Sequence, residues 1–321
     1  MNYLKQLAGQ TFVYGLGIVI PRILNYILLT PFYTRVFSKS EYGIVTELYA
    51  YVVFLIVILT YGLETGFFRF ADKRSNKEHV YKTALISVSF STVVFLVLGH
   101  IFYDNVAIAL DYEQQKYLLL ILAWIVGLDA FSSIPFARIR LENKARKYAV
   151  IRIIEVLVNI FFNWFFIWFC AKNYTQHQIL GFVYNPEIGV GYVLISNVIA
   201  TIVKTLLLYQ EIFMKTGRFL FSLWKKILRY SFPLLIAGLA GTVNEAIDRI
   251  LLKHLVPDAL NPLEQLGVYG ANYKLAVLMT LFIQMFRYAA EPFFFSRKEE
   301  SNARQIYADV MGRDMEISRS T

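Results

Sequence analysis

Eight apolar stretches, each long enough to cross a bilayer, constrain the fold more than any other feature of the sequence. A hydrocarbon core of ~30 Å requires about 20 mostly apolar residues in a helix. The stretches are predicted over residues 11–33, 43–66, 83–103, 117–138, 149–170, 188–209, 231–250 and 267–290. Helices of this kind satisfy their backbone hydrogen bonds internally, as lipid requires. The sequence therefore predicts an all-α, polytopic membrane protein.

The composition excludes several classes of soluble protein. Charged residues make up 17% of the chain and hydrophobic residues 57%, whereas a typical soluble domain has about 25% charged residues. The single Cys170 excludes a disulfide framework and a cysteine-based metal cluster, and the four histidines show no metal-ligand spacing. Neither GxxxxGK(S/T) nor GxGxxG occurs, so we expect no ATP or dinucleotide site. The Cys and His pattern predicts no metal site, and the short loops leave no room for a catalytic domain, so we expect no enzymatic activity.

Lysine and arginine residues concentrate in alternate loops. The basic loops lie at about 69–82, 138–147, 215–229 and 297–319, whereas the loops between them contain few basic residues. Positive residues are retained in the cytoplasm, so this pattern predicts a cytoplasmic N-terminus. The topology also explains the net charge of +9, and we expect no nucleic-acid partner.

A weak internal repeat suggests how the spans are grouped. Aligning Gly43, at the start of the second span, with Gly267, at the start of the eighth, also pairs Tyr49 with Tyr273. If the repeat is real, the last two spans begin a second six-helix unit and the sequence is truncated. The alternative is a complete eight-helix protein with a short tail. The predicted parts are a six-helix lobe at 1–209, a basic linker on the inner leaflet at 210–230, two helices of a second lobe at 231–295, and a polar cytoplasmic tail at 296–321, in which 312–321 are candidate non-native residues.

The first span carries a charge near the middle of the membrane. Such a charge costs from ~3 to more than ~10 kcal/mol, so it marks a candidate functional site. Arg22 lies beside Pro21, and Asn25 lies on the same helical face. A kink at Pro31 adds to a pattern that favours a water-filled interior. A guanidinium there suits a phosphate, which is the favoured interpretation. A buried ion pair with Asp129 is the alternative, and both could hold.

Other polar residues within the spans have both functional and structural interpretations. Arg152 and Glu155 are three residues apart and favour a simple ion pair, and Asn159 and Asn163 suit either a cavity or a contact between helices. Glu47 and Glu64 could carry a proton or Na⁺, or could be solvated at the membrane surface. In the seventh span, Asn244 and Asp248 share a face with Gly241, whereas Glu245 and Arg249 form a helical pair. The eighth span carries a polar stripe formed by Thr280, Gln284, Arg287 and Glu291. Lys274 lies on another side of this helix.

Three short motifs carry a resemblance to a known family. They are the opening Met1–Thr11 (MNYLKQLAGQT), Pro31–Phe37 (PFYTRVF) followed by Ser40–Gly43 (SEYG), and Asn244–Arg249 (NEAIDR). Together they resemble the polysaccharide biosynthesis (Wzx-type) flippases of the multidrug/oligosaccharidyl-lipid/polysaccharide (MOP) exporter superfamily, over about residues 1–300. The resemblance implies two six-helix lobes around a cationic cavity. It also implies a lipid-diphosphate-linked oligosaccharide, such as an O-antigen unit, moved from the inner to the outer leaflet by alternating access.

The resemblance also implies roles for particular residues. Arg22 lies where related lipid II flippases carry an arginine in the cavity, and Lys274 lies where they carry a basic residue. The residues that we expect to bind substrate are Arg22, Asn25, Arg35, Asn244 and Lys274. Those that we expect to couple ions or to gate are Glu47, Asp129 and Asp248.

The expected partners follow from this function. They are a polyprenyl-diphosphate-linked oligosaccharide, membrane lipids, H⁺ or Na⁺, and glycan polymerase or assembly proteins, and the expected location is the bacterial cytoplasmic (inner) membrane. Three alternatives stay open. A cation-coupled multidrug exporter would need a more acidic, aromatic cavity, and a membrane-embedded glycan polymerase or ligase would need a larger external loop. The third is a non-transporting assembly partner.

Overall fold

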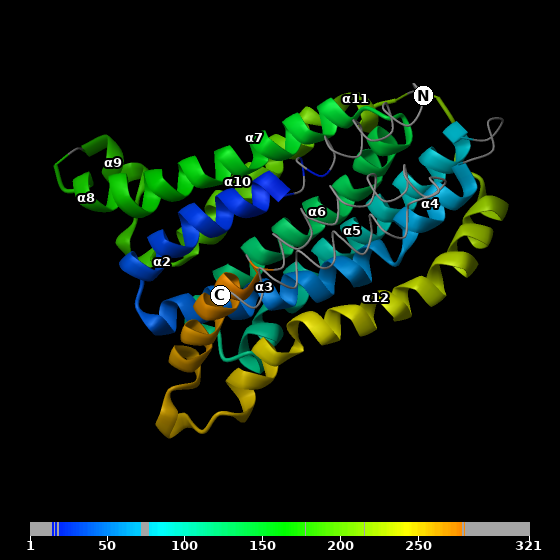
Figure 1. Ribbon diagram of the computed structural model, residues 1–321. Helices are drawn as coiled ribbons and strands as arrows, with labels where there is room; N and C mark the ends of the chain where they lie inside the picture. The colour runs from blue at the N-terminus through cyan, green and yellow to red at the C-terminus, as the bar shows by residue number, and fades with distance from the viewer. Residues whose placement is uncertain are drawn as a thin grey trace, which may run out of the picture.

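The computed structural model describes residues 15, 17, 19–71, 77–176, 178–214, 216–277 and 279. Throughout these residues the chain forms helices, turns and short connections, with no strand, which confirms the all-α prediction (Figure 1). Residues 19–24 and 262–277 are also helical. The named elements are η1 (Asn25–Leu29), α2 (Thr30–Val36), α3 (Lys39–Thr60), α4 (Leu63–Ala71), α5 (Lys77–Ala109), η2 (Glu113–Gln115), α6 (Tyr117–Leu141), α7 (Ala145–Trp164), η3 (Phe165–Cys170), α8 (Ala171–Asn173), α9 (Gln178–Val183), η4 (Pro186–Ile188), α10 (Gly191–Leu207), α11 (Tyr209–Ile212), α12 (Phe221–Leu255) and η5 (Asp258–Leu260).

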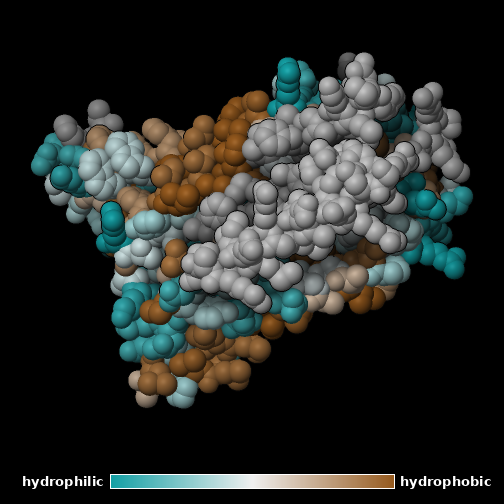
Figure 2. All heavy atoms as spheres, viewed as in Figure 1, coloured by the Kyte–Doolittle hydropathy of each residue, from teal (hydrophilic) through white to brown (hydrophobic). Residues whose placement is uncertain are grey.

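Several helices have the length and composition of membrane spans. Among the described residues, four helical segments qualify, and α10 is a shorter apolar helix. The four segments are Lys39–Ala71, Lys77–Ala109, Tyr117–Leu141 and Ala145–Asn173. Figure 2 shows hydrophobic residues along the segment that α7 and η3 form and hydrophilic residues beyond it, around α8 and α9, as expected for a helix in lipid. The ends of the first and eighth predicted spans, 11–14 and 280–290, lie outside the described residues.

The first described helix widens beside the predicted kink. Asn25–Leu29 is a π-helical segment, and Pro31 lies in the first turn of α2. Proline supplies no N–H to the turn before it, and a wider turn is one way in which a helix accommodates that loss. The structure thus replaces the predicted simple kink with a π segment that starts at Asn25.

The second predicted span is broken near one end. Tyr61, at the C-cap of α3, has a left-handed backbone with φ of 34°, and Gly62 follows with φ of 69°. A Cβ atom at Gly62 would lie 2.8 Å from the carbonyl oxygen of Ser231 in α12. Glycine therefore serves two purposes here, because it adopts the positive φ and lets α12 approach.

The starts of α3 and of helix 262–277 pack reciprocally. A Cβ atom on Gly43 would overlap the carbonyl oxygen of Leu263, and one on Gly267 would overlap that of Lys39. Each carbonyl belongs to the residue four positions before the partner glycine, so the contact is symmetric. A twofold-related pair of repeats would produce such a contact. Figure 1 shows the orange 262–277 segment returning to the blue start of α3.

Helix α12 starts earlier than the sequence predicted. It begins at Phe221 and continues through Pro233, so residues 221–230 of the predicted linker are helical. The segment before it is held against α5: the Tyr81 hydroxyl donates to the Glu211 carbonyl (2.6 Å), and the backbone N–H of Leu220 donates to Thr83 Oγ1 (3.2 Å). The indole N–H of Trp224 donates to Ser87 Oγ (2.7 Å). These contacts fix the α10–α12 connection at the end that carries the basic loops.

Candidate functional site

A cavity of about 370 Å³ brings together residues that are far apart in the sequence. We call it the Lys274 cavity. The first helix, α3, α7, α10, α12 and helix 262–277 all contribute to its wall. Of the five residues predicted to bind substrate, three line it: Arg22, Asn25 and Lys274. Its other polar and aromatic lining residues include Tyr26, Tyr33, Tyr49, Asn159, Asn197, Glu245, Arg249 and Tyr273.

The Lys274 cavity is basic. Arg22, Arg249 and Lys274 supply three positive charges to its described wall, against the single carboxylate of Glu245. The Arg249 guanidinium lies 4.0 Å from the centre of the Tyr273 ring and donates to the backbone oxygen of Glu245 (3.2 Å). The Lys274 ammonium lies 5.0 Å from the centre of the Tyr42 ring. Ring faces orient these cations without neutralising them, so the cavity suits an anion.

Three asparagine side chains line the same cavity. Asn159 Oδ1 accepts from the amide of Asn163 (3.0 Å), and the Asn197 amide donates to the Tyr49 hydroxyl (2.6 Å). Asn25 Oδ1 is buried and has no hydrogen-bond partner among the described residues. A buried acceptor without a donor costs about 1–3 kcal/mol. A ligand hydroxyl in the cavity would satisfy this atom.

Asn163 has a structural role rather than a cavity role. It is fully buried and accepts a hydrogen bond from the Tyr33 hydroxyl (2.7 Å), which joins α2 to α7. Of the two asparagines that the sequence left open between cavity and helix contact, Asn159 lines the cavity and Asn163 joins helices.

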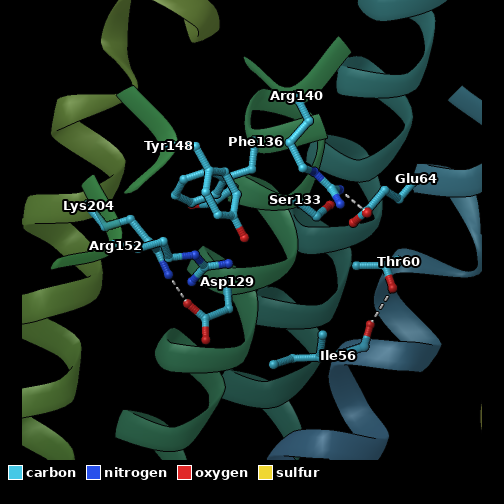
Figure 3. Close-up of a pocket in the computed structure, with 11 residues that line it drawn as sticks. Ile56, Thr60, Glu64, Asp129, Ser133, Phe136, Arg140, Tyr148, Arg152 and Lys204 are labelled. Carbon is cyan, nitrogen blue, oxygen red and sulfur yellow. Dashed lines mark hydrogen bonds and ion pairs between the residues drawn. The ribbon is translucent and has the colours of Figure 1, made fainter. Parts of the chain in front are cut away.

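Two further cavities continue the polar path through the bundle. The Glu155 cavity, about 440 Å³, shares Arg22, Asn25, Asn159 and Asn197 with the Lys274 cavity. It also shares Asp129, Tyr148 and Arg152 with the Arg140 cavity, about 360 Å³ (Figure 3). Arg140 lies in the last turn of α6, within the basic segment 138–147. The three cavities therefore form a row that reaches towards the end of the bundle with the basic loops.

An ion cluster centred on the buried Lys204 lies between the Glu155 and Arg140 cavities. The Lys204 ammonium contacts Asp129, with which it forms an ion pair, and lies 2.8 Å from Glu155 Oε1. Glu155 also pairs with Arg152 (3.0 Å), as the sequence predicted. The sequence left open an ion pair between Arg22 and Asp129. In the structure Asp129 pairs with Lys204 instead, although Arg22 and Asp129 line the same cavity.

Glu47 and Glu64 both form ion pairs. Glu47 is fully buried and lies 3.1 Å from the Lys253 ammonium of α12. It also accepts hydrogen bonds from the hydroxyls of Tyr112 (2.7 Å) and Tyr51 (3.0 Å), so it is not solvated at the membrane surface. Glu64 is more exposed and pairs with Arg140. Glu47 thus joins α3 to α12 at the end of the bundle opposite the basic loops.

The remaining predicted site residues lie outside the three cavity linings. Arg35 is exposed in the last turn of α2, and Asn244 is exposed on α12. Asp248 accepts from the Tyr269 hydroxyl and from the backbone N–H of Arg249. The predicted stripe Thr280, Gln284, Arg287 and Glu291 lies outside the described residues.

Sequence reasoning missed several lining residues. The sequence predicted that Arg249 pairs with Glu245 within the helix, and it assigned no role to Lys204. In the structure Arg249 lines the Lys274 cavity and Lys204 lines the Arg140 cavity. For Lys204 the available signal was a lysine inside an apolar span, which requires a partner wherever it is buried.

Comparison with known proteins agrees with this architecture. A family model described as "Polysaccharide biosynthesis protein" matches residues 7–297, so the chain belongs to this family, and the resemblance seen in the sequence is confirmed. No curated protein matches the chain.

Two solved structures have a similar fold. One is described as the inward-facing conformation of a multidrug resistance MATE family transporter of the MOP superfamily. It has a TM-score of 0.64 and 15% identity over 89% of this chain and 66% of that one. The other is a MATE protein in complex with Br-NRF, with a TM-score of 0.52 and 14% identity over 95% of this chain and 71% of that one. The chain is thus a multi-pass membrane protein with the MATE fold, and it spans 66% of the length of the first structure.

Proposed function

We propose that this protein moves a lipid-diphosphate-linked oligosaccharide from the cytoplasmic to the outer leaflet of a bacterial inner membrane by alternating access. Membership of the polysaccharide biosynthesis family supports the choice of a glycan. The cavity supports the choice of an anionic headgroup.

The observation that carries the proposal is the convergence of Arg22, Arg249 and Lys274 on one cavity. A diphosphate offers several negatively charged oxygens, and a guanidinium can bind two of them at once with parallel N–H donors. The Asn25 oxygen, which has no hydrogen-bond partner within the described part of the chain, suits a sugar hydroxyl next to the phosphates. A three-to-one excess of basic groups also attracts an anion from a distance.

The arrangement of the three cavities supports entry of the lipid headgroup from the cytoplasmic side. The Arg140 cavity lies at the basic end, which the positive-inside rule places in the cytoplasm. At the other end, the glycine contact between α3 and helix 262–277 and the Glu47–Lys253 pair close the bundle. Opening these contacts while the basic end closes would expose the Lys274 cavity to the outer side. H⁺ or Na⁺ coupling and contact with glycan-assembly proteins remain parts of this proposal.

Multidrug export is the alternative that the fold raises, because one structural neighbour is described as a multidrug resistance transporter. A cavity for cationic drugs requires an excess of carboxylates. The Lys274 cavity has the opposite balance, with Glu245 as the one carboxylate in its described wall. The charge therefore favours an anionic cargo.

A translocation assay tests the proposal. The purified chain is reconstituted into vesicles with a fluorescent oligosaccharide carried on a polyprenyl diphosphate, and an impermeant reductant reports the labelled lipid in the outer leaflet. We expect faster exchange than in protein-free vesicles, and slower exchange with Lys274→Ala, because one of the three cations is lost. Export of a cationic dye without movement of the diphosphate lipid would replace this proposal with multidrug export.

A further inference from the structure

The ion cluster between the Glu155 and Arg140 cavities has an unusual centre. Lys204 is only 2% exposed, and its ammonium bridges the carboxylates of Asp129 on α6 and Glu155 on α7. Figure 3 shows Lys204 and Arg152 pointing towards Asp129 from neighbouring helices. The ammonium lies between two carboxylates on different helices. A free cation would bind at this position if the lysine side chain did not reach it.

The charges within the cluster balance. Asp129 and Glu155 contribute two negative charges, and Lys204 and Arg152 contribute two positive charges. Burying a charge without a partner is strongly unfavourable, whereas a neutral, hydrogen-bonded cluster is tolerated. Arg152 also lies over the Phe136 ring, with its guanidinium carbon 4.4 Å from the ring centre. A metal cation added to this cluster would create an excess positive charge at a buried site.

Hydroxyl and amide side chains lie on the same two helices as Asp129 and Lys204, and Ser132 lines the Arg140 cavity together with both of them. Ser132 on α6 is buried and lies 3.2 Å from the Thr205 hydroxyl on α10. One turn earlier on α10, Thr201 donates to Asn197 Oδ1 (3.3 Å). Carboxylate, hydroxyl and amide oxygens are the ligands that hard cations prefer. Removal of the lysine side chain would therefore leave two carboxylates beside a vacant space, with Ser132 in the same cavity wall.

We propose that Lys204 is a built-in monovalent cation. Its ammonium occupies the oxygen-lined site formed by Asp129 and Glu155, so this site takes no Na⁺ in the protein, and it becomes an alkali-cation site when the lysine side chain is removed. Any Na⁺ coupling of transport must then use another part of the transporter. The inference concerns ion binding and does not rest on the proposed cargo.

Thermal unfolding of the purified full chain in nanodiscs tests the inference without a transport assay. The unfolding midpoint is compared in NaCl and in choline chloride of equal ionic strength. The wild-type protein and Lys204→Arg are expected to have the same midpoint in both salts. Lys204→Ala leaves the two carboxylates with one counter-charge, so its midpoint should fall in choline and rise saturably with Na⁺, because a bound ligand stabilises the folded state.

A matched control removes a lysine from an exposed ion pair. Lys116 lies 2.7 Å from Asp104, and both side chains are about half exposed. Lys116→Ala should change the midpoint little and show no preference for Na⁺ over choline. An equal midpoint of Lys204→Ala in both salts would overturn the inference. So would a Na⁺-specific stabilisation of the wild-type protein that is lost in Asp129→Asn.

A second variant covers the case in which Lys204→Ala does not fold. The double variant Lys204→Ala/Asp129→Asn restores charge balance, since one positive and one negative charge are removed. It is expected to fold and to be indifferent to Na⁺. Failure of this double variant to fold would show that the lysine acts through more than its charge and would overturn the inference.

Discussion

Arg22→Ala is expected to abolish translocation of the diphosphate lipid while leaving membrane insertion intact. Arg22 lines both the Lys274 and the Glu155 cavities, so its guanidinium is available to a ligand at the centre of the row. Each lost hydrogen bond to a charged group costs about 1.5–3 kcal/mol, or roughly 10- to 150-fold in affinity, and a guanidinium can donate two such bonds to one phosphate. Arg22→Lys keeps the charge but loses the paired donors, so it should retain partial activity.

Arg146→Ala is the control for this substitution. Arg146 is an exposed arginine in the first turn of α7 and lines none of the three cavities. Its removal should leave the rate of translocation close to that of the wild-type protein. Normal translocation by Arg22→Ala, at equal amounts of inserted protein, would refute the role of Arg22 in the cavity.

Gly43→Ala is expected to separate α3 from helix 262–277. The added methyl group would overlap the Leu263 carbonyl oxygen, which belongs to the helix backbone and cannot rotate away. Overpacking of this kind costs about 1–3 kcal/mol, and the cost falls on the state in which this end is closed. We expect a lower unfolding midpoint and faster maleimide labelling of a cysteine placed at Thr46, which faces Gly270 across the same contact.

The chain offers a cysteine-free background and a control glycine for this experiment. Cys170 is the only cysteine of the chain, so Cys170→Ala supplies a background without thiols. Gly241, in the long helix α12, has no atom within 4 Å of an added Cβ, so Gly241→Ala should be neutral or slightly stabilising. If Gly43→Ala matched Gly241→Ala in both stability and labelling, the close contact would have no role in closing this end.

Hydropathy was sufficient to predict that the described apolar stretches are helical, but not where the helices break. A run of apolar residues long enough for the bilayer forces a helix, whatever the tertiary contacts. The break at Tyr61 and Gly62 depends on the approach of Ser231, which lies far along the chain. The start of α12 at Phe221 was missed because Lys225 and Lys226 lower the local hydropathy, although they lie in the same helix.

A site residue could be predicted only where the residue itself was unusual for its position, as a charged residue is inside an apolar span. Arg22 and Lys274 stood out because charges inside spans are costly, and both line one cavity. Arg249 was hidden by a plausible local pair with Glu245. Lys204 was hidden because its partners lie on two other helices. Contacts between helices depend on how the helices pack, and span periodicity does not specify that packing.

Equilibrium binding of lipid phosphates to the chain in nanodiscs tests the central claim most directly. The account predicts that polyprenyl diphosphate binds more tightly than the monophosphate and that uncharged polyprenol binds weakest. Added salt should weaken the binding, because it screens charges in an open cavity. The triple variant Arg22→Ala/Arg249→Ala/Lys274→Ala should lose the preference for diphosphate. Equal binding of diphosphate and polyprenol by the wild-type protein, or an unchanged preference in the triple variant, would contradict the account.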